Sequence, residues 1–473
     1  MRFRQMVRFG VISLATMASA LLLGQGGQDH ASLVKGPFKS GPEVTRACLE
    51  CHQSHAEEFM KTVHWTWSSR QKLKGKDADF GKKNAINNFC LALTSNEPRC
   101  TSCHAGYGWK DASFDFTKAE NVDCLVCHDT TGTYKKFPTA AGNPVLQDME
   151  WPKGSGKIMK AVDLEAVARK VGKTSRATCG ACHFYGGGGD HVKHGDLDSS
   201  LTRPTRARDV HMATDGPDMS CTACHKTERH VIPGKALSVS VSGGGQTLDC
   251  TTCHAGSPHK KNAILNNHAK RVACQTCHIP TFSRDLPTKV WWDWSTAGKD
   301  QPVTKDAHGM ALYDKMKGDF RWAKDVRPTY LWFNGSVDRY LLGDAIKPGQ
   351  VVYLNQPLGH RADKTAKIAP FKIMEGRQPY DTGNNLLLVV KLFGGYWAHY
   401  DWVKGSADGM KEAGLPFTGK VGFTDTRMFW KVNHMVVPKA QALKCTDCHA
   451  PNGLMDWKAL GYAGDPRKPS RKG

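Results

Sequence analysis

A five-residue unit, Cys-x-x-Cys-His, occurs eight times in this chain of 473 residues and constrains its fold more than any other feature. Every copy runs directly into histidine, although the chain has only 21 histidines. A single Cys-x-x-Cys could be a zinc knuckle, a redox pair or half of a disulfide framework, but the repeated histidine makes the unit the attachment signature of c-type haem. The cysteines are Cys48, Cys51, Cys100, Cys103, Cys124, Cys127, Cys179, Cys182, Cys221, Cys224, Cys250, Cys253, Cys274, Cys277, Cys445 and Cys448, and the adjoining histidines are His52, His104, His128, His183, His225, His254, His278 and His449.

The spacing of the unit has a chemical reason. Two thiols three residues apart lie on one helical turn, so each can form a thioether with a vinyl group on the same porphyrin edge. The adjoining histidine then lies under the iron as its proximal ligand. The sequence therefore predicts eight covalently attached haem c groups with eight proximal histidines.

Eight porphyrins also predict the kind of fold. A chain of this length would ordinarily divide into domains with separate hydrophobic cores, but each porphyrin is a large flat apolar body around which short helices and loops can pack. We therefore expect residues 27–473 to form one octahaem domain, a multihaem cytochrome c body cored by porphyrins, mainly α with extensive loops and a few short β-hairpins. Residues 281–437 carry no motif, and we expect this haem-free excursion to pack on the rest.

Local patterns predict several elements. Residues 42–67 are expected to form a helix carrying the first motif, and Asp163 is expected to cap a short amphipathic helix that ends at Gly172. In the haem-free region, residues 329–333 and 336–341 flank Asn334-Gly335 as a predicted hairpin. Residues 351–354 and 386–390 are further short strand candidates.

The N-terminus resembles a secretory signal. Arg2, Arg4 and Arg8 form a basic region before an apolar, small-residue-rich stretch over residues 9–23. That stretch is shorter than the roughly 20 residues that a spanning helix needs, and no other segment of the sequence could span a bilayer. We therefore expect residues 1–26 to be a signal peptide and the mature chain to be periplasmic, soluble rather than membrane-embedded, where haem attachment takes place.

The chain is strongly basic, with 65 Lys plus Arg against 44 Asp plus Glu. Such a balance often indicates a nucleic acid or membrane surface as partner. Here the haem propionates would neutralise most of it, which leaves about +10 for the mature oxidised protein and no reason to expect nucleic acid. The remaining positive field favours small anionic substrates.

One cysteine lies outside the motifs. Seventeen cysteines in an exported protein would normally predict disulfides, but the motifs use sixteen of them. Cys90 is left as a single thiol, close in sequence to the second motif.

Thirteen histidines lie outside the motifs, and because His30 lies at the signal boundary, twelve remain as candidates for the sixth iron position. His230 and His259 each stand five residues beyond a motif histidine, too near to reach the opposite face of the same porphyrin, so each should ligate a neighbouring haem. If every haem had two histidines, the chain would be an electron wire with no iron position for substrate. The candidate sixth ligands are His64, His194, His211, His230, His259, His268 and His434.

The arrangement of the motifs, seven before Ile279 and one near the end, resembles that of the octahaem tetrathionate reductase family of periplasmic cytochromes. Segments 123–132 (DCLVCHDTTG) and 179–189 (CGACHFYGGGG) carry the resemblance. Segments 194–200, 209–212 and 434–438 fit it too, so it covers nearly the whole mature chain. It is more distantly similar to hydroxylamine oxidoreductase and the multihaem nitrite reductases.

The resemblance implies one active-site haem, attached through the second motif, with a lysine ligand and a nearby cysteine. Cys90 matches the cysteine, with a buried inert thiol as the alternative. No Cys-x-x-Cys-Lys occurs, so the lysine must come from elsewhere, with Lys135, Lys136 and Lys153 as candidates. Whether His104 keeps its iron stays open.

The resemblance further implies a terminal reductase of small sulfur or nitrogen oxyanions. Tetrathionate, nitrite and hydroxylamine are the expected small inorganic substrates, anionic or neutral. Electrons would come from a small redox donor protein or a membrane quinol-oxidising cytochrome. The alternatives are an electron conduit with all haems bis-histidine ligated, and the oxidative direction from hydroxylamine to nitrite.

Overall fold

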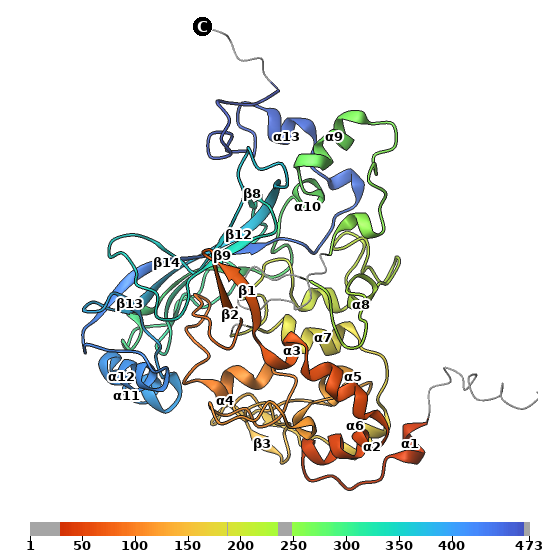
Figure 1. Cartoon of the computed structure of the whole chain (residues 1–473), viewed down its shortest axis with the longest axis vertical. Coiled ribbons are helices and arrows are strands. Elements are labelled where there is room, and N and C mark those ends of the chain that lie inside the picture. The colour runs from red at the N-terminus through yellow and green to blue at the C-terminus, as the bar shows by residue number, and fades with distance from the viewer. Residues whose placement is uncertain (1–28, 187, 235–247, 468–473) are drawn as a thin grey trace, which may run out of the picture.

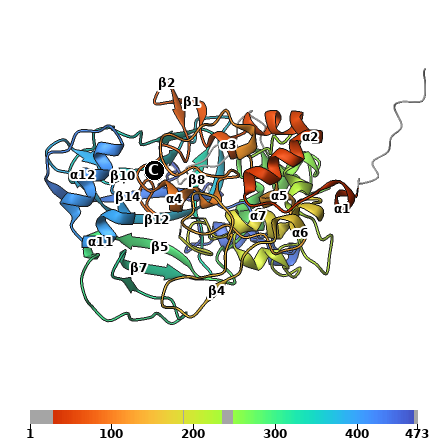
Figure 2. The ribbon, with the colours of Figure 1, turned by 90° about the horizontal axis from the view of Figure 1, so that it is seen from below.

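The computed structural model describes residues 29–186, 188–234 and 248–467. The predicted signal peptide, residues 1–26, lies outside them. Short helices and loops form one side of the molecule, and a large sheet with α11 and α12 forms the other (Figures 1 and 2). No helix within the described ranges is both long and apolar enough to cross a membrane.

The motifs lie on single helical turns, as the thioether chemistry requires. Six of them are on α-helices, while the second continues from α4 into the 3₁₀ turn Thr101–Cys103 and the sixth lies on the 3₁₀ turn Cys250–Thr252. The helices are α1 His30–Leu33, α2 Gly41–Met60, α3 Val63–Thr66, α4 Glu97–Cys100, α5 Leu125–His128, α6 Leu164–Arg169, α7 Arg176–His183, α8 Cys221–Cys224, α9 Ala263–Arg271, α10 Cys274–His278, α11 Trp397–His399, α12 Trp402–Glu412 and α13 Cys445–His449.

The predicted helices agree with the structure in place but not always in length. The single helix expected over residues 42–67 is two helices, α2 and α3, separated at Lys61 and Thr62. Asp163 caps α6 as predicted, because its Oδ1 accepts a hydrogen bond from the Ala166 amide at 2.9 Å. The α6 helix ends at Arg169, one turn before Gly172.

The haem-free region forms a mixed eight-stranded sheet, so the expectation of only short hairpins is wrong there. Its strand order is β10-β14-β12-β5-β7-β6, with β8 and β13 also paired to β12. The strands are β1 Ser69–Leu73, β2 Lys76–Phe80, β3 Met149–Glu150, β4 Ile158–Met159, β5 Thr288–Asp293, β6 Tyr313–Asp314, β7 Gly318–Ala323, β8 Thr329–Phe333, β9 Val337–Arg339, β10 Val352–Tyr353, β11 Asn355–Pro357, β12 Lys367–Asp381, β13 Leu386–Leu387 and β14 Val421–Lys431.

The longest strand pairing in this sheet is the antiparallel one between β12 and β14. The register runs from Phe371 opposite Lys431 to Asp381 opposite Val421, and β12 also pairs in parallel with β5. The predicted hairpin around Asn334 is wrong in its pairing: β8 pairs with β12, and β9 pairs with β11. Both strands exist, but their partners are distant in sequence.

The largest hydrophobic core joins the sheet to the segment that contains Cys90. Trp292 and Trp294 stack at 4.8 Å within it. Side-chain amides fasten the segment to the sheet, because Asn88 Nδ2 donates to the Met374 carbonyl at 2.7 Å and Asn96 Nδ2 to the Val390 carbonyl at 2.8 Å. The sheet therefore fixes the position of the chain that leads into the second motif.

Candidate haem centres

Cysteines of different motifs come together in pairs. The hydrogen-bonded thiols are Cys48 with Cys124, Cys103 with Cys182, Cys179 with Cys221, and Cys250 with Cys274. These contacts join the first motif to the third, the second to the fourth, the fourth to the fifth, and the sixth to the seventh.

Weaker electrostatic contacts between cysteines link the motifs that these pairs do not join. The Cys127 thiol interacts with that of Cys179, linking the third motif to the fourth. Cys224 interacts with Cys253, linking the fifth to the sixth, and Cys277 with Cys445, linking the seventh to the eighth. The motifs therefore follow the spatial order 1-3-4-5-6-7-8, with the second motif branching from the fourth.

Five motif histidines face a histidine from outside the motifs. Two imidazoles on opposite sides of one metal, each bound at roughly 2 Å through a nitrogen roughly 1.1 Å from its ring centre, would have ring centroids about 6.3 Å apart. The five pairs are His52 with His30 and His449 with His268, each at 6.2 Å, and His183 with His64, His254 with His211 and His278 with His259, each at 6.1 Å.

Two further motif histidines lie close to a non-motif histidine. His230 is near enough to His128, and His434 to His225, for their charges to repel, which contributes to the lowered pKa values of His230 and His225 after burial as the main cause. Seven motifs thus have a candidate histidine pair. His194 is not in one: its ring packs against Trp430 at 4.9 Å.

Hydrogen bonds orient several of these rings for iron binding through Nε2. His128 Nδ1 donates to the Gly172 carbonyl, His225 Nδ1 to that of Pro233, and His268 Nδ1 to that of Ile264, at 2.8, 2.8 and 2.9 Å. A carbonyl oxygen can only accept, so the proton is on Nδ1 and the lone pair is on Nε2. The residues present therefore fit bis-histidine haem.

His104, in the second motif, uses Nε2 instead of Nδ1 for its hydrogen bond. Its Nε2 lies 2.7 Å from the Trp65 carbonyl and must be the donor, so the nitrogen that would ligate iron is engaged elsewhere. The fully buried ring is enclosed by Trp65, Trp67 and Trp109 at centroid distances of 5.2, 5.3 and 4.9 Å. Burial lowers the pKa of His104 to about 3. Among the described residues, no histidine ring faces it at the 6.1 or 6.2 Å of the five ring pairs, and His64, whose charge also lowers the pKa of His104, faces His183 instead.

Of the three candidate lysines, Lys136 lies beside this histidine. Its Nζ donates to the carbonyl oxygens of His104 and Gly106 and lies 2.9 Å from Asp123 Oδ2. Lys136 and Asp123 are both buried. Lys135 and Lys153 are exposed.

Two tyrosines complete the surroundings of Asp123. Tyr107 donates its hydroxyl to Asp123 Oδ1 at 2.7 Å, and Tyr134 donates to Oδ2 at 2.9 Å. The carboxylate is thus fully engaged by two hydroxyls and an ammonium group, which explains how it tolerates complete burial.

Cys90 lies against the second motif, as its position in sequence suggested. Its thiol interacts electrostatically with that of Cys100. Burial raises the pKa of Cys90, opposed by the positive charges of Lys317, Arg99 and Lys289. The half-buried thiol is therefore held in its protonated form close to several cations.

Two further lysines lie at the second motif and were not among the sequence candidates. Lys82 Nζ is 3.5 Å from the Cys100 carbonyl and 4.0 Å from the Trp67 ring centre. Burial, together with the charge of Lys82, lowers the pKa of Lys193 to about 8 despite the nearby Cys103 and Cys182 thiols. In a chain with 65 Lys and Arg, no spacing distinguishes these two residues.

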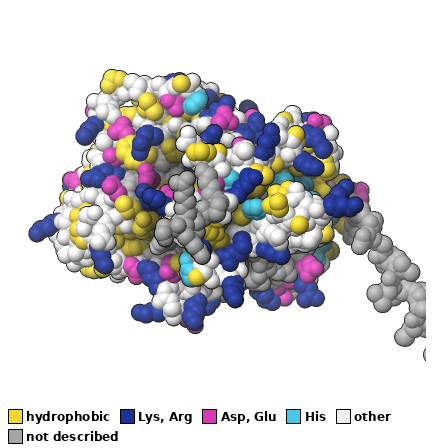
Figure 3. Space-filling model, turned by 90° about the horizontal axis from the view of Figure 1, so that it is seen from above, with side chains coloured by type: hydrophobic (Ala, Val, Ile, Leu, Met, Phe, Trp, Pro, Cys, Tyr) yellow, Lys and Arg dark blue, Asp and Glu magenta, His cyan; other side chains and the backbone are white. Residues whose placement is uncertain are grey.

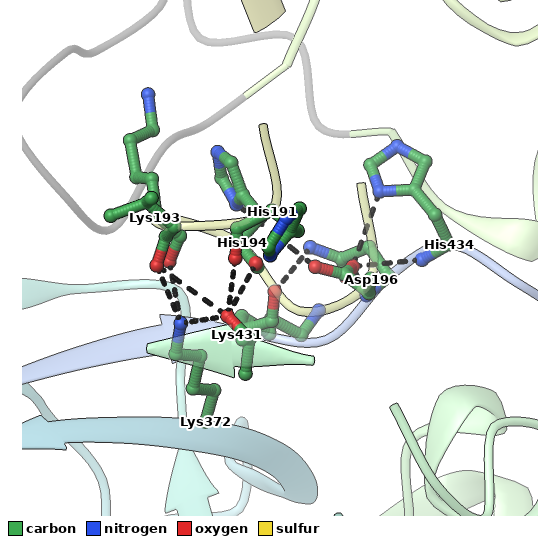
Figure 4. Close-up of polar contacts among 10 residues, drawn as sticks. His191, Lys193, His194, Asp196, Lys372, Lys431 and His434 are labelled. Atoms are coloured by element: carbon green, nitrogen blue, oxygen red, sulfur yellow. Dashed lines mark hydrogen bonds and ion pairs between the residues drawn. The ribbon is translucent and has the colours of Figure 1, made fainter. Parts of the chain in front are cut away.

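The sheet positions Lys193 through a second buried lysine (Figure 4). Lys372, on β12, donates to the carbonyls of Val192 and Lys193 at 3.1 and 3.0 Å and to Thr288 Oγ1, on β5, at 2.6 Å. Thr288 in turn donates to the His191 carbonyl at 2.6 Å. Burial lowers the pKa of Lys372 to about 7.

Asp196 ties the same loop to His434 (Figure 4). Its Oδ2 accepts from the backbone amides of Asn433 and His434 at 2.7 and 3.0 Å and lies 3.2 Å from His434 Nδ1. Burial would raise the pKa of Asp196, but the hydrogen bond and charge of His434 outweigh it and hold the pKa at about 2. His194 Nδ1 is 4.0 Å from the same carboxylate.

Comparisons with known proteins place the chain among the cytochromes c. A family model described as "Cytochrome c bacterial" matches residues 289–452, and one described as "Cytochrome c554 and c-prime" matches residues 47–129. The crystal structure of octaheme cytochrome c from Shewanella oneidensis is 49% identical, with a TM-score of 0.86, over 93% of this chain and 98% of that one. The chain belongs to the octahaem cytochrome c family. The family resemblance found in the sequence is thereby confirmed.

The octahaem cytochrome also resembles an uncharacterized protein from Archaeoglobus fulgidus. The two are 24% identical over 266 residues, which is 46% of this chain and 89% of that protein. Beyond haem, the described residues contain no cluster of three or more His, Cys, Asp or Glu that could hold a bare metal ion.

Proposed function

We propose that this octahaem cytochrome binds eight haem c groups through its eight motifs and ligates seven of them with two histidines. The sixth ligands would be His30, His230, His64, His434, His211, His259 and His268 for the first, third, fourth, fifth, sixth, seventh and eighth haems. Support comes from the five pairs with centroids at 6.1 or 6.2 Å and from the charge interactions of His230 with His128 and of His434 with His225. His194 would then be a polar residue of the Asp196 loop.

We further propose that the second motif is the active site and that Lys136, rather than His104, ligates its iron. The observation that supports this is the orientation of His104, whose Nε2–H donates a hydrogen bond to the Trp65 carbonyl. A lysine must be neutral to ligate a metal, so Lys136 would give up the ammonium proton that faces Asp123 in this structure, and the carboxylate with its two tyrosines would then accept a hydrogen bond from the neutral amine and orient it.

Haem bound at the second motif would supply electrons. Because none of the described residues provides a second histidine there, its iron would keep a coordination position for substrate. Lys82 and Lys193 would stabilise a bound anion there, because ammonium groups in a desolvated site interact strongly with negative charge. Cys90, held as a thiol, would contact a sulfur or nitrogen atom of the substrate. These residues fit a small oxyanion better than an organic substrate.

The function that the site supports best is a terminal reductase of the small oxyanions tetrathionate or nitrite, or of neutral hydroxylamine. Tetrathionate would take up two electrons as its central S–S bond breaks to give two thiosulfates. Electrons would pass along the seven paired haems and reach the site through the fourth motif, the neighbour of the second. The protein would work in the periplasm.

The eighth motif is one end of that path, and electrons would enter there. Cys445 is exposed there, as are Lys261, Lys270 and Lys444. The face seen from above carries many Lys and Arg side chains with histidines among them (Figure 3). Such a face would attract an acidic donor, either a small redox protein or a quinol-oxidising cytochrome of the membrane.

Electron paramagnetic resonance of the oxidised protein, combined with substrate assays, tests the proposal. We expect low-spin bis-histidine signals together with one distinct species, and oxidation of the reduced protein by at least one of tetrathionate, nitrite and hydroxylamine. Lys136→Met should alter the distinct species and abolish turnover, whereas the exposed neighbour substitution Lys135→Met should change neither. Eight bis-histidine signals and no turnover would instead identify an electron conduit.

A further inference from the structure

Two of the paired histidines donate Nδ1 to a carboxylate instead of a carbonyl. His449 Nδ1 lies 2.6 Å from Asp465 Oδ1, and His434 Nδ1 lies 3.2 Å from Asp196 Oδ2. They belong to the eighth and the fifth motif centres. The histidine opposite each one, His268 or His225, donates Nδ1 to a backbone carbonyl.

Both carboxylates are held in place. Asp196 is buried and accepts two backbone amides besides the imidazole. Asp465 Oδ1 also accepts the Arg467 amide at 3.0 Å. The His449 ring stacks on Trp457 at 5.3 Å, so it cannot turn its Nδ1 away without losing that contact.

A carboxylate on the outer nitrogen of an axial histidine changes the ligand electronically. It draws the Nδ1 proton toward itself and makes Nε2 a stronger electron donor. It also brings a negative charge close to the iron in a partly desolvated site. Both effects stabilise the ferric state more than the ferrous state, and so lower the reduction potential.

We propose that Asp196 and Asp465 are positioning residues that lower the reduction potentials of the haems at the fifth and eighth motifs. The inference rests on the histidine ligation proposed above. Along the spatial order of the motifs, the sixth and seventh centres lie between these two. Electrons would collect on the two intervening haems, which suits a substrate that takes up electrons in pairs.

Redox titration of the complete holoprotein, followed by absorbance and by the low-spin resonance signals, tests the proposal. In Asp465→Asn and in Asp196→Asn the amide oxygen can still accept the Nδ1 proton while the charge is lost. We expect one midpoint potential in each variant to become more positive by at least about 59 mV, a tenfold change in its reduction equilibrium. Haem content and low-spin ligation should stay unchanged.

Glu58→Gln is the matched control. Glu58 Oε2 lies 3.6 Å from His230 Nδ1 at the third motif, so it brings the same charge through a longer and weaker contact with the proton. We expect a much smaller shift there. Equal shifts in Glu58→Gln and Asp465→Asn would show a general charge effect and overturn the proposal.

Asp196→Asn could disturb the backbone amides that Asp196 accepts, and in that case the result from Asp465→Asn alone decides the test. Unchanged midpoints in a correctly loaded Asp465→Asn protein would overturn the inference whatever the enzyme reduces. Absence of low-spin signals from the wild-type protein would overturn the ligation itself, and turnover with oxyanions bears on neither result.

Discussion

The buried amine of Lys193 should make substrate affinity depend on pH. Its pKa is lowered to about 8 by burial and by the charge of Lys82, so its side chain is cationic below that pH and neutral above it. Affinity for an anionic substrate should therefore be full below about pH 8 and fall as the pH rises through it. The Michaelis constant for tetrathionate, measured between about pH 6 and pH 10, reports this fall.

Lys193→Arg provides the control, because a guanidinium stays charged over that whole range. The variant should keep a low Michaelis constant at high pH. If its pH dependence matched that of the wild-type protein, another group would be responsible.

Cys90→Ala tests the single thiol. We expect turnover with tetrathionate to fall at least about tenfold, since a group close to the reacting atoms is removed, while haem content stays at eight. Cys90→Ser, which keeps a hydroxyl in place of the thiol, should be intermediate. Unchanged kinetics in both variants would remove Cys90 from the site.

The sequence predicts those site residues whose pattern is set by neighbours in the chain, and misses those that depend on distant segments. The motif cysteines and histidines are local, because thioether chemistry fixes their spacing. His30 was set aside for lying beside the signal, yet it faces His52 at 6.2 Å. Lys193 and the orientation of His104 depend on side chains from distant segments, such as Trp65 and Lys82, and leave no trace in spacing.

At the scale of elements, the sheet and the loop of residues 191–196 are joined by a buried polar contact. Thr288→Val keeps the shape of the side chain but removes the donor to the His191 carbonyl and one acceptor for Lys372. Leaving such groups buried without partners costs about 1–3 kcal/mol. Urea unfolding of the holoprotein should show a loss of that size.

Thr329→Val, on the exposed first position of β8, is the comparison. Its effect should stay within about 0.5 kcal/mol, as is usual for exposed positions. Similar losses in the two variants would mean that the contact with Lys372 adds nothing.

The long strand β12 explains why the sheet was not foreseen. It contains Pro370 and Pro379, which argue against a central strand, and the buried polar residues Lys372 and Gln378 interrupt any regular alternation. Its partners β5, β8 and β14 are far apart in sequence, so no local pattern specifies them. The Asp163 cap, a local feature, was predicted correctly.

For the whole molecule, the spatial order of the motifs branches at the fourth centre. Electrons from the other six paired haems must pass through it to reach the second motif. Methionine in place of an axial histidine raises the haem potential. His64→Met should therefore trap an electron at the junction and slow reoxidation of the other haems by substrate, as measured by stopped-flow absorbance.

His30→Met, at the first centre and so at one end of the path, should slow that reoxidation far less. Equal slowing by the two substitutions would contradict the branched order. In either variant the haem count should remain eight, which mass spectrometry of the intact protein would verify.

The histidine pairs also set an order of assembly. In five of them the non-motif histidine precedes its motif, as His64 precedes His183, so a chain exported from its N-terminus already contains both ligands when each of these haems is attached. The other two centres differ, because His230 emerges after His128 and His434 emerges long after His225. The fifth centre therefore stays open until shortly before the eighth motif emerges, and a chain that ends ahead of His434 would lack both the second ligand of the fifth haem and the attachment site of the eighth.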